Sequence, residues 1–229
     1  MALEIVFTNM LGVCSDYAPI PAEKMLPDWY KNTPSYIDNN PLVVDGKLGH
    51  TIKKCVPVFD ALTAGYLIIT FVDVQVTQVD GQPFFQWPSH NPIGGHPMIQ
   101  AENHPIQNGS PFAKWNNPWA IRTPPGYSCL FVPPMHNPNG IFTILPGITD
   151  TDNYRAPVNF PFVLDDPKWE GTIPVGTPIA QVLPFRRDSW KMSIGDDKDV
   201  RAATKDLIRL TSRWRNAYKT MFWSRKQYR

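Results

Sequence analysis

Cysteine, charge and long apolar runs are all scarce in this sequence. The 229 residues include only Cys14, Cys55 and Cys129, which are far apart and odd in number, so the pattern argues against a disulfide framework or a zinc knuckle. No stretch reaches the ~18 apolar residues that a membrane helix needs, and the first residues lack the basic and apolar regions of a secretory signal. These absences predict an unexported, cytoplasmic protein that does not enter a membrane.

Proline, in contrast, is abundant. The chain has 25 prolines, roughly twice the average usage, and they lie between apolar runs. This spacing favours many short strands with rigid connections over long helices. We expect a single domain over residues 1–229, with an irregular N-terminal arm (1–50), a core (51–190) that contains a long loop (88–118), and a C-terminal helix (196–223).

The strand signal begins at residue 66. Residues 66–79 are rich in β-branched side chains and increasingly alternate, and Asp80-Gly81 predicts a tight turn into residues 84–87. Short strands then follow, separated by proline or glycine, at residues 119–122, 128–132, 140–145, 158–164, 170–173 and 179–184. The predicted class is therefore all-β, with a small distorted β-barrel or sandwich as the architecture.

The C-terminal region predicts an amphipathic helix. Apolar side chains recur at steps of three and four residues, namely at Val200, Ala203, Leu207, Leu210, Trp214, Ala217 and Met221. Residues 198–229 carry ten Lys/Arg against two Asp, a net charge of +8, whereas the rest of the chain carries −6. The apolar stripe either packs on the domain or joins subunits, and the basic tail suits an acidic partner surface, a neighbouring copy or nucleic acid.

Four short motifs occur in a fixed order. They are Thr63-Ala-Gly-Tyr66, the strand from Pro125 to Pro134, Gly147-Ile-Thr-Asp150-Thr-Asp-Asn-Tyr154-Arg155, and Gly176-Thr-Pro-Ile-Ala-Gln181. In this order they resemble the dUTPase and dCTP deaminase superfamily over residues 63–184. The resemblance implies a β-clip fold and a homo-oligomer, most often a trimer with active sites between subunits.

The resemblance also implies roles for individual residues. Asp150 would orient or deprotonate the attacking water, and Tyr154 would pack under the base and sugar. Turns such as those at Gly176 and Gln181 would approach the ligand, and the alternative for Asp150 is a carboxylate that caps its own turn. The phosphate-binding Arg and Ser of the family are missing from residues 132–136, which leaves Arg155, Arg186 and Arg187 as replacement cations.

Nearly the whole chain, including residues 111–128 and 184–191, is also similar to a family of uncharacterised proteins of bacteria and bacteriophages. This second resemblance implies a bacteriophage origin, in a virion or the host cytoplasm, and it brings no established activity with it. A divalent metal at His90, His96 and His104 is a further hypothesis, and ordinary hydrogen bonds of loop histidines are its alternative.

Two functions are therefore open. In the first, the protein is a non-hydrolytic binding or assembly element that contacts copies of itself and other virion or host proteins. In the second, it is a nucleotide or small-molecule hydrolase that uses Asp150 as general base. Nucleic-acid binding through the basic C-terminal helix is a third, separate hypothesis.

Overall fold

The computed structural model describes residues 3–41, 43–44, 47–96, 100, 102–109, 112–212 and 216–229. By its internal contacts the chain forms two compact units. Unit 1 comprises Met1–Pro27, Leu62–Arg187 and Tyr228–Arg229, and unit 2 comprises Asp28–Ala61 and Asp188–Gln227. The assignment of the whole chain to one domain stays a prediction.

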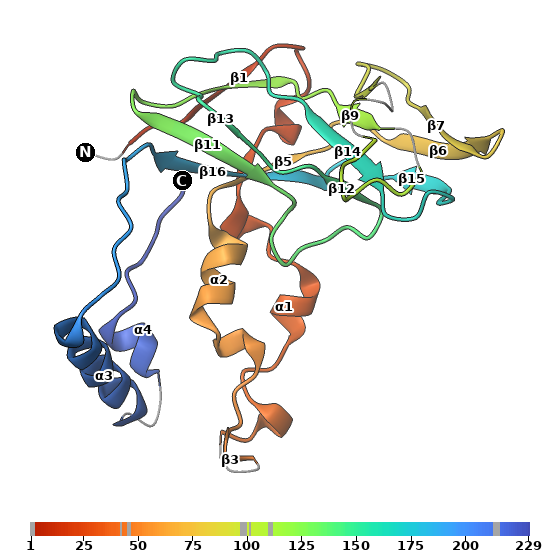
Figure 1. The fold of residues 1–229 in the computed structure, drawn as a ribbon. Coiled ribbons are helices and arrows are strands. Elements are labelled where there is room, and N and C mark those ends of the chain that lie inside the picture. Colours follow the sequence, from red (N-terminus) through yellow and green to blue (C-terminus); the bar gives the residue numbers. More distant parts are fainter. Residues whose placement is uncertain are drawn as a thin grey trace. The chain divides into compact units, whose positions relative to one another are not determined.

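Unit 1 is built from four antiparallel sheets (Figure 1). The five-stranded sheet has the order β13 (Gly147–Thr149), β11 (Tyr127–Val132), β16 (Pro178–Arg186), β5 (Tyr66–Ile69), β2 (Ile20–Pro21). The four-stranded sheet has the order β12 (Phe142–Ile144), β14 (Phe160–Leu164), β9 (Ala113–Trp115), β8 (Ile93–Gly95). The smaller sheets are β15 (Gly171–Ile173), β6 (Val74–Val79), β7 (Gln82–Gln86), and the pair β1 (Val6–Asn9), β10 (Trp119–Arg122).

The mainly β, antiparallel character predicted from the sequence is confirmed. In the described residues, however, no sheet closes into the expected distorted barrel. The edge strands β13 and β2 have only three and two residues, so each offers too few hydrogen bonds to carry the five-stranded sheet around to closure. Residues 3–27 of the predicted arm supply β1 and β2 to these sheets.

Aromatic side chains fill the core of unit 1. Trp115 stacks on Phe162 with ring centroids 5.2 Å apart, and Phe142 lies 5.1 Å from Trp115 and 5.4 Å from Phe162. Phe131 and Phe160 form a neighbouring pair at 5.5 Å. Buried aromatic pairs in this distance range stabilise a core beyond the area they bury, so the aromatics of β9, β11, β12 and β14 hold the sheets together.

Unit 2 contains short helices and one small hairpin. From residues 28–61 come α1 (Asp28–Asn32), the hairpin of β3 (Val43–Val44) and β4 (Lys47–Leu48), and most of α2 (Val56–Thr63). Single 3₁₀ turns flank them at Ile37–Asn39 and Ile52–Lys54, and unit 1 has similar turns at Ser15–Tyr17 and Ala22–Lys24. From the C-terminal region come α3 (Asp197–Ser212) and α4 (Ala217–Met221).

The C-terminal helix differs from the one that the sequence predicts over residues 196–223. It is present as α3 and α4, and Asn216 has a left-handed backbone with φ of 55°. A residue in that conformation ends a right-handed helix, so α4 begins as a separate element. Trp214 of the predicted apolar stripe lies outside the described residues.

The connection from α2 to β5 requires glycine at position 65. Gly65 has φ of 68°, and a Cβ added to it would collide with the backbone carbonyl oxygen of Val182 in β16. We expect Gly65→Ala to lower the free energy of unfolding by more than about 3 kcal/mol, because left-handed strain and backbone overlap both act. Urea denaturation measures this change.

Gly12→Ala is the matched control. Gly12 has nearly the same φ, 65°, but nothing lies within 4 Å of the added Cβ, so only the strain of roughly 1–2 kcal/mol applies. Equal losses in the two variants would show that β16 does not pack closely on residue 65.

Candidate functional site

The turn after β13 presents two carboxylates. The backbone N–H groups of Asn153 and Tyr154 donate to the carbonyl of Asp150 at 3.0 and 2.8 Å, which closes the turn tightly. Asp150 therefore lies in a turn, which agrees with the acidic turn that the sequence predicts there. The second carboxylate, Asp152, accepts a hydrogen bond from the backbone N–H of Gly126 at 2.8 Å.

Two further side chains reach this turn from the central ladder. Ser128 of β11 donates its hydroxyl to Asp150 Oδ1 at 2.7 Å, and Arg187, directly after β16, donates Nη1 to Ser128 Oγ at 3.0 Å. The same guanidinium binds Asp152 with both terminal nitrogens, at 2.8 and 2.5 Å, and lies 3.3 Å from Asp150 Oδ1. We call Ser128, Asp150, Asp152 and Arg187 the guanidinium clasp.

The clasp shifts the protonation of its charged members. Hydrogen bonding to Arg187 lowers the pKa of Asp152 to about 2, although the partial burial of this carboxylate opposes the shift. The hydrogen bond to Asp152 in turn raises the pKa of Arg187. Both groups are therefore fully charged near neutral pH, and the bidentate geometry makes their pairing specific.

Buried polar groups support the clasp from beneath. Thr123 and Thr151 share a hydrogen bond of 2.7 Å between their hydroxyls, and Thr151 donates to Cys129 Sγ at 3.4 Å. Burial raises the pKa of the Cys129 thiol to about 11, so this cysteine stays protonated and chemically inert. The turn is thus fixed to β11 both at its surface and in the core.

The clasp is poorly suited to phosphate chemistry. Arg187 already faces the carboxylates of Asp152 and Asp150, so its charge is largely neutralised before any ligand arrives. A phosphate entering this site would also meet the two negative charges of the turn, and like charges in one site repel. The geometry instead ties the turn to the end of β16.

Among the other predicted site residues, Tyr154 donates its backbone N–H to the carbonyl of Asp150. Tyr154 and Arg155 are exposed, and Gly176 forms the left-handed turn that leads into β16. Gln181 is buried and bonds main chain at both ends, accepting from Met135 N at 2.8 Å and donating to Ala64 O at 2.6 Å. Arg186 ends β16 opposite Tyr127 of β11.

The three predicted metal ligands each have a local partner. His90 lies 2.8 Å from Ser89 Oγ, His96 contacts Gln100, and His104 accepts from the N–H of Ile106 at 3.2 Å. In the part of the chain that the structure describes, no three His, Cys, Asp or Glu side chains are grouped to hold a metal ion. Each of the three histidines thus makes a local hydrogen bond, and metal binding by them stays a prediction.

Sequence reasoning singled out Asp150 and Arg187 but missed Ser128 and Asp152. Ser128 and Arg187 are 59 positions apart, and only the register of β11 with β16 brings them together. Asp152 carried a weak signal, because it is the second acid of an Asp-x-Asp turn. Its pairing with Arg187 could not be read from that spacing.

The clasp predicts how stability depends on pH. The folded pKa of Asp152 lies below the ordinary aspartate value of about 3.9, so ionised Asp152 stabilises the fold above that pH and the contribution is lost as pH falls toward 2. We expect Asp152→Asn to be less stable than the wild type at pH 7, and the difference to shrink toward pH 2. Denaturation at a series of pH values measures it.

Asp16→Asn is the control, since Asp16 is an exposed aspartate of unit 1. Its difference from the wild type should stay nearly constant over the same pH range. If Asp152→Asn and the wild type lost stability in parallel on acidification, the ion pair would contribute nothing to the fold.

Comparison of the sequence with protein-family models and with curated proteins found no match. The function is therefore inferred from the residues and their arrangement, and the likeness to the dUTPase superfamily rests on the four motifs alone.

Proposed function

We propose that this protein is a non-hydrolytic assembly element whose C-terminal arm, residues 188–212, binds a second copy of the chain. The β-clip assignment of unit 1 is part of this proposal, and so is the trimeric state that the resemblance implies. The observation that carries it is a run of large apolar side chains left uncovered on the arm.

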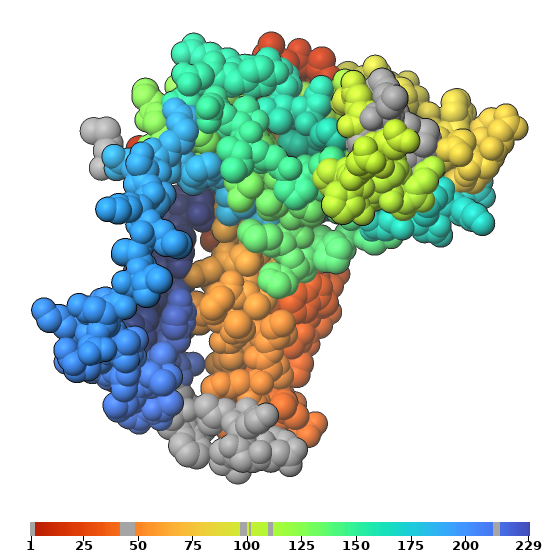
Figure 2. Space-filling view, in the orientation of Figure 1, coloured from red at the N-terminus to blue at the C-terminus, as the bar shows by residue number. Residues whose placement is uncertain are grey.

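The first half of the arm has no regular structure and exposes its largest side chains. Trp190, Met192 and Ile194 are 90%, 89% and 94% exposed, and Figure 2 shows the light-blue segment that follows β16 uncovered on the face in view. Burying each of these side chains would contribute about 1.5–3 kcal/mol. Large apolar side chains that are exposed together at every second position of a short segment are typical of an interaction surface.

The second half of the arm is an amphipathic helix with an uncovered apolar face. Val200, Leu207 and Ile208 of α3 are each 61% exposed, and no residue of α3 is buried. Positions 200, 207 and 208 share one side of a helix because they are seven and eight residues apart. Within the structure these three side chains have little cover, whereas Leu210 of the same stripe is half-buried, and of the two expectations, packing on the domain or packing between subunits, we adopt the second.

Charge complementarity favours another copy of this chain as the occupant. Residues 198–229 carry +8, while the remainder of the chain carries −6. A basic C-terminal region and an acidic body attract each other between two copies and steer their encounter. No helix in the described residues has the length and apolar character needed to cross a bilayer, so the apolar side chains are not part of a membrane-spanning helix there.

The clasp supports the non-hydrolytic part of the proposal. A hydrolase of the kind that the resemblance implies needs cations free to hold a triphosphate. Here Arg187 is bound by Asp152 and approached by Asp150, and the carboxylate of Asp150 already accepts from Ser128. The residues that would be reused for catalysis are engaged in closing the fold.

We expect the triple variant Trp190→Ser, Met192→Ser and Ile194→Ser to convert the oligomer into monomers. The apolar area that drives association is removed, whereas the fully exposed positions contribute little to the folded chain itself. Sedimentation velocity over a range of concentrations gives the oligomeric state, and thermal melting at low concentration checks the fold.

A triple variant of Val79, Phe84 and Ile148 to Ser is the control, since these exposed apolar residues of unit 1 lie outside the arm. It should keep the wild-type oligomeric state. A wild type that stays monomeric at high concentration contradicts the proposal, and binding of that monomer to lipid vesicles would identify a membrane surface as the occupant instead.

The proposal also predicts the absence of turnover. We expect no phosphate or pyrophosphate release from dUTP, dCTP or dATP with Mg²⁺ present, because Arg187 is already paired with Asp152 and Asp150 already accepts from Ser128. A coupled phosphate assay at high protein concentration measures this. Turnover that disappears in Asp150→Asn but persists in Asp16→Asn would replace the assembly function with the hydrolase.

A further inference from the structure

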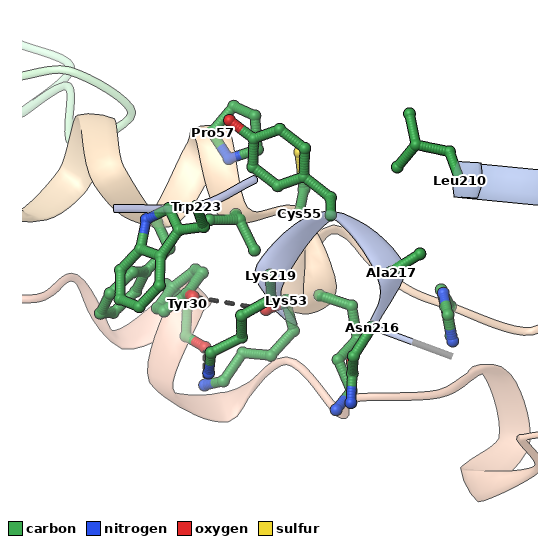
Figure 3. Close-up of a pocket in the computed structure, with 14 residues that line it drawn as sticks. Tyr30, Lys53, Cys55, Pro57, Leu210, Asn216, Ala217, Lys219 and Trp223 are labelled. Atoms are coloured by element: carbon green, nitrogen blue, oxygen red, sulfur yellow. Dashed lines mark hydrogen bonds between the residues drawn. The ribbon is translucent and has the colours of Figure 1, made fainter. Parts of the chain in front are cut away.

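Unit 2 contains a cavity of about 520 Å³, within the range typical of small-molecule sites. Figure 3 shows side chains from α1, the start of α2 and α4 around it, with Leu210 from the end of α3. The lining residues that matter for recognition are basic or aromatic, namely Tyr30, Lys53, Lys54, Tyr218, Lys219 and Trp223.

The cavity wall is positively charged. Lys53, Lys54 and Lys219 line it, and no aspartate or glutamate among the described residues does. Within the described residues none of these three ammonium groups pairs with a carboxylate. Lys54 and Lys219 lie over the rings of Tyr36 and Trp223, at 5.1 and 5.8 Å. An anion that enters would therefore meet ammonium groups that no acid has neutralised.

Lys53 is held in place rather than mobile. Its Nζ donates to the backbone carbonyls of Tyr30 and Lys31, the latter at 3.0 Å, and lies 4.5 Å from the centroid of the Tyr30 ring. These contacts fix the position of the charge without cancelling it, since carbonyls and rings carry no net charge. The site thus contains one cation that carbonyl oxygens hold in place and two that lie over aromatic rings.

The aromatic walls are also fixed. Trp223 donates its indole N–H to both carboxylate oxygens of Asp60, at 2.9 and 3.0 Å, and Asp60 is further paired with Lys226. Tyr30 packs against Phe59 with ring centroids 6.3 Å apart. Burial raises the pKa of Tyr30, so the phenol stays neutral and does not repel an anion. Rigid aromatic faces beside cations suit a flat ligand.

We infer that this cavity binds a planar aromatic anion, meaning a ring that carries a phosphate or a carboxylate. The lysines would bind the anionic group, and Trp223 and the exposed Tyr218 would contact the ring. This inference is independent of the assembly function, because it concerns residues on the cavity wall and not the exposed faces of the arm.

Adenosine monophosphate and indole-3-acetate are the probes for the phosphate and the carboxylate, measured by isothermal titration calorimetry on the full chain. Adenosine and inorganic phosphate are the half-ligands. At least one of the two probes should bind more tightly than either half-ligand, and its affinity should fall with added salt. Lys54→Gln and Lys219→Gln should each weaken it by about tenfold, the loss of one charge-assisted contact.

Lys168→Gln is the matched control, an exposed lysine of unit 1 outside the cavity, and it should leave the affinity unchanged. Unchanged melting temperatures in all three variants separate loss of charge from loss of fold. The inference is overturned if neither probe binds, or if binding survives both cavity substitutions. Binding of an oligothymidylate without binding of either probe would also overturn it and assign the lysines to nucleic acid.

Discussion

The pairing of β11 with β16 is the constraint on which the rest of unit 1 depends. Its register sets Tyr127 opposite Arg186, and therefore carries Arg187 to the end of β11 where Ser128 lies. Because β13 pairs with the other edge of β11, the turn after Thr149 arrives at the same end of the sheet. One ladder thus assembles the clasp from three separate segments, and it also determines where the chain leaves the sheet to begin the arm.

The partners of Arg187 limit what the turn after β13 can bind. A phosphate-binding site needs a cation that is available to pair with the ligand. Here Arg187 already forms an ion pair with Asp152 and lies close to Asp150. Internal pairing of this kind favours a stable closure of the turn, and it removes the charge that would attract a triphosphate. The guanidinium of Arg187 therefore holds the turn after β13 against the end of β16.

The sequence was a good guide wherever the signal was local. Asp80-Gly81 correctly predicted the hairpin of β6 and β7, and 119–122 matches β10. The sequence was a poor guide where the structure depends on contacts between segments that are far apart in the chain. Residues 66–79 look continuous but divide into β5 and β6, which belong to different sheets. The cavity of unit 2 combines Tyr30 and Lys53 with Lys219, more than 160 positions further on, and no periodic pattern connects such residues.

Helix α3 links the two surfaces of unit 2. Leu210 lies on the cavity wall, whereas Leu207 and Ile208, on the preceding turn, are exposed. The C-terminal region also returns to unit 1, because Tyr228 packs edge to face against Tyr66 of β5 at 6.0 Å. Tethering at both ends reduces the conformational freedom that the arm must lose when a partner covers it. Leu207 and Leu210 are three residues apart and so lie on one side of α3. A ligand in the cavity and a partner on the arm would both restrain this helix, and their binding would be linked to that extent.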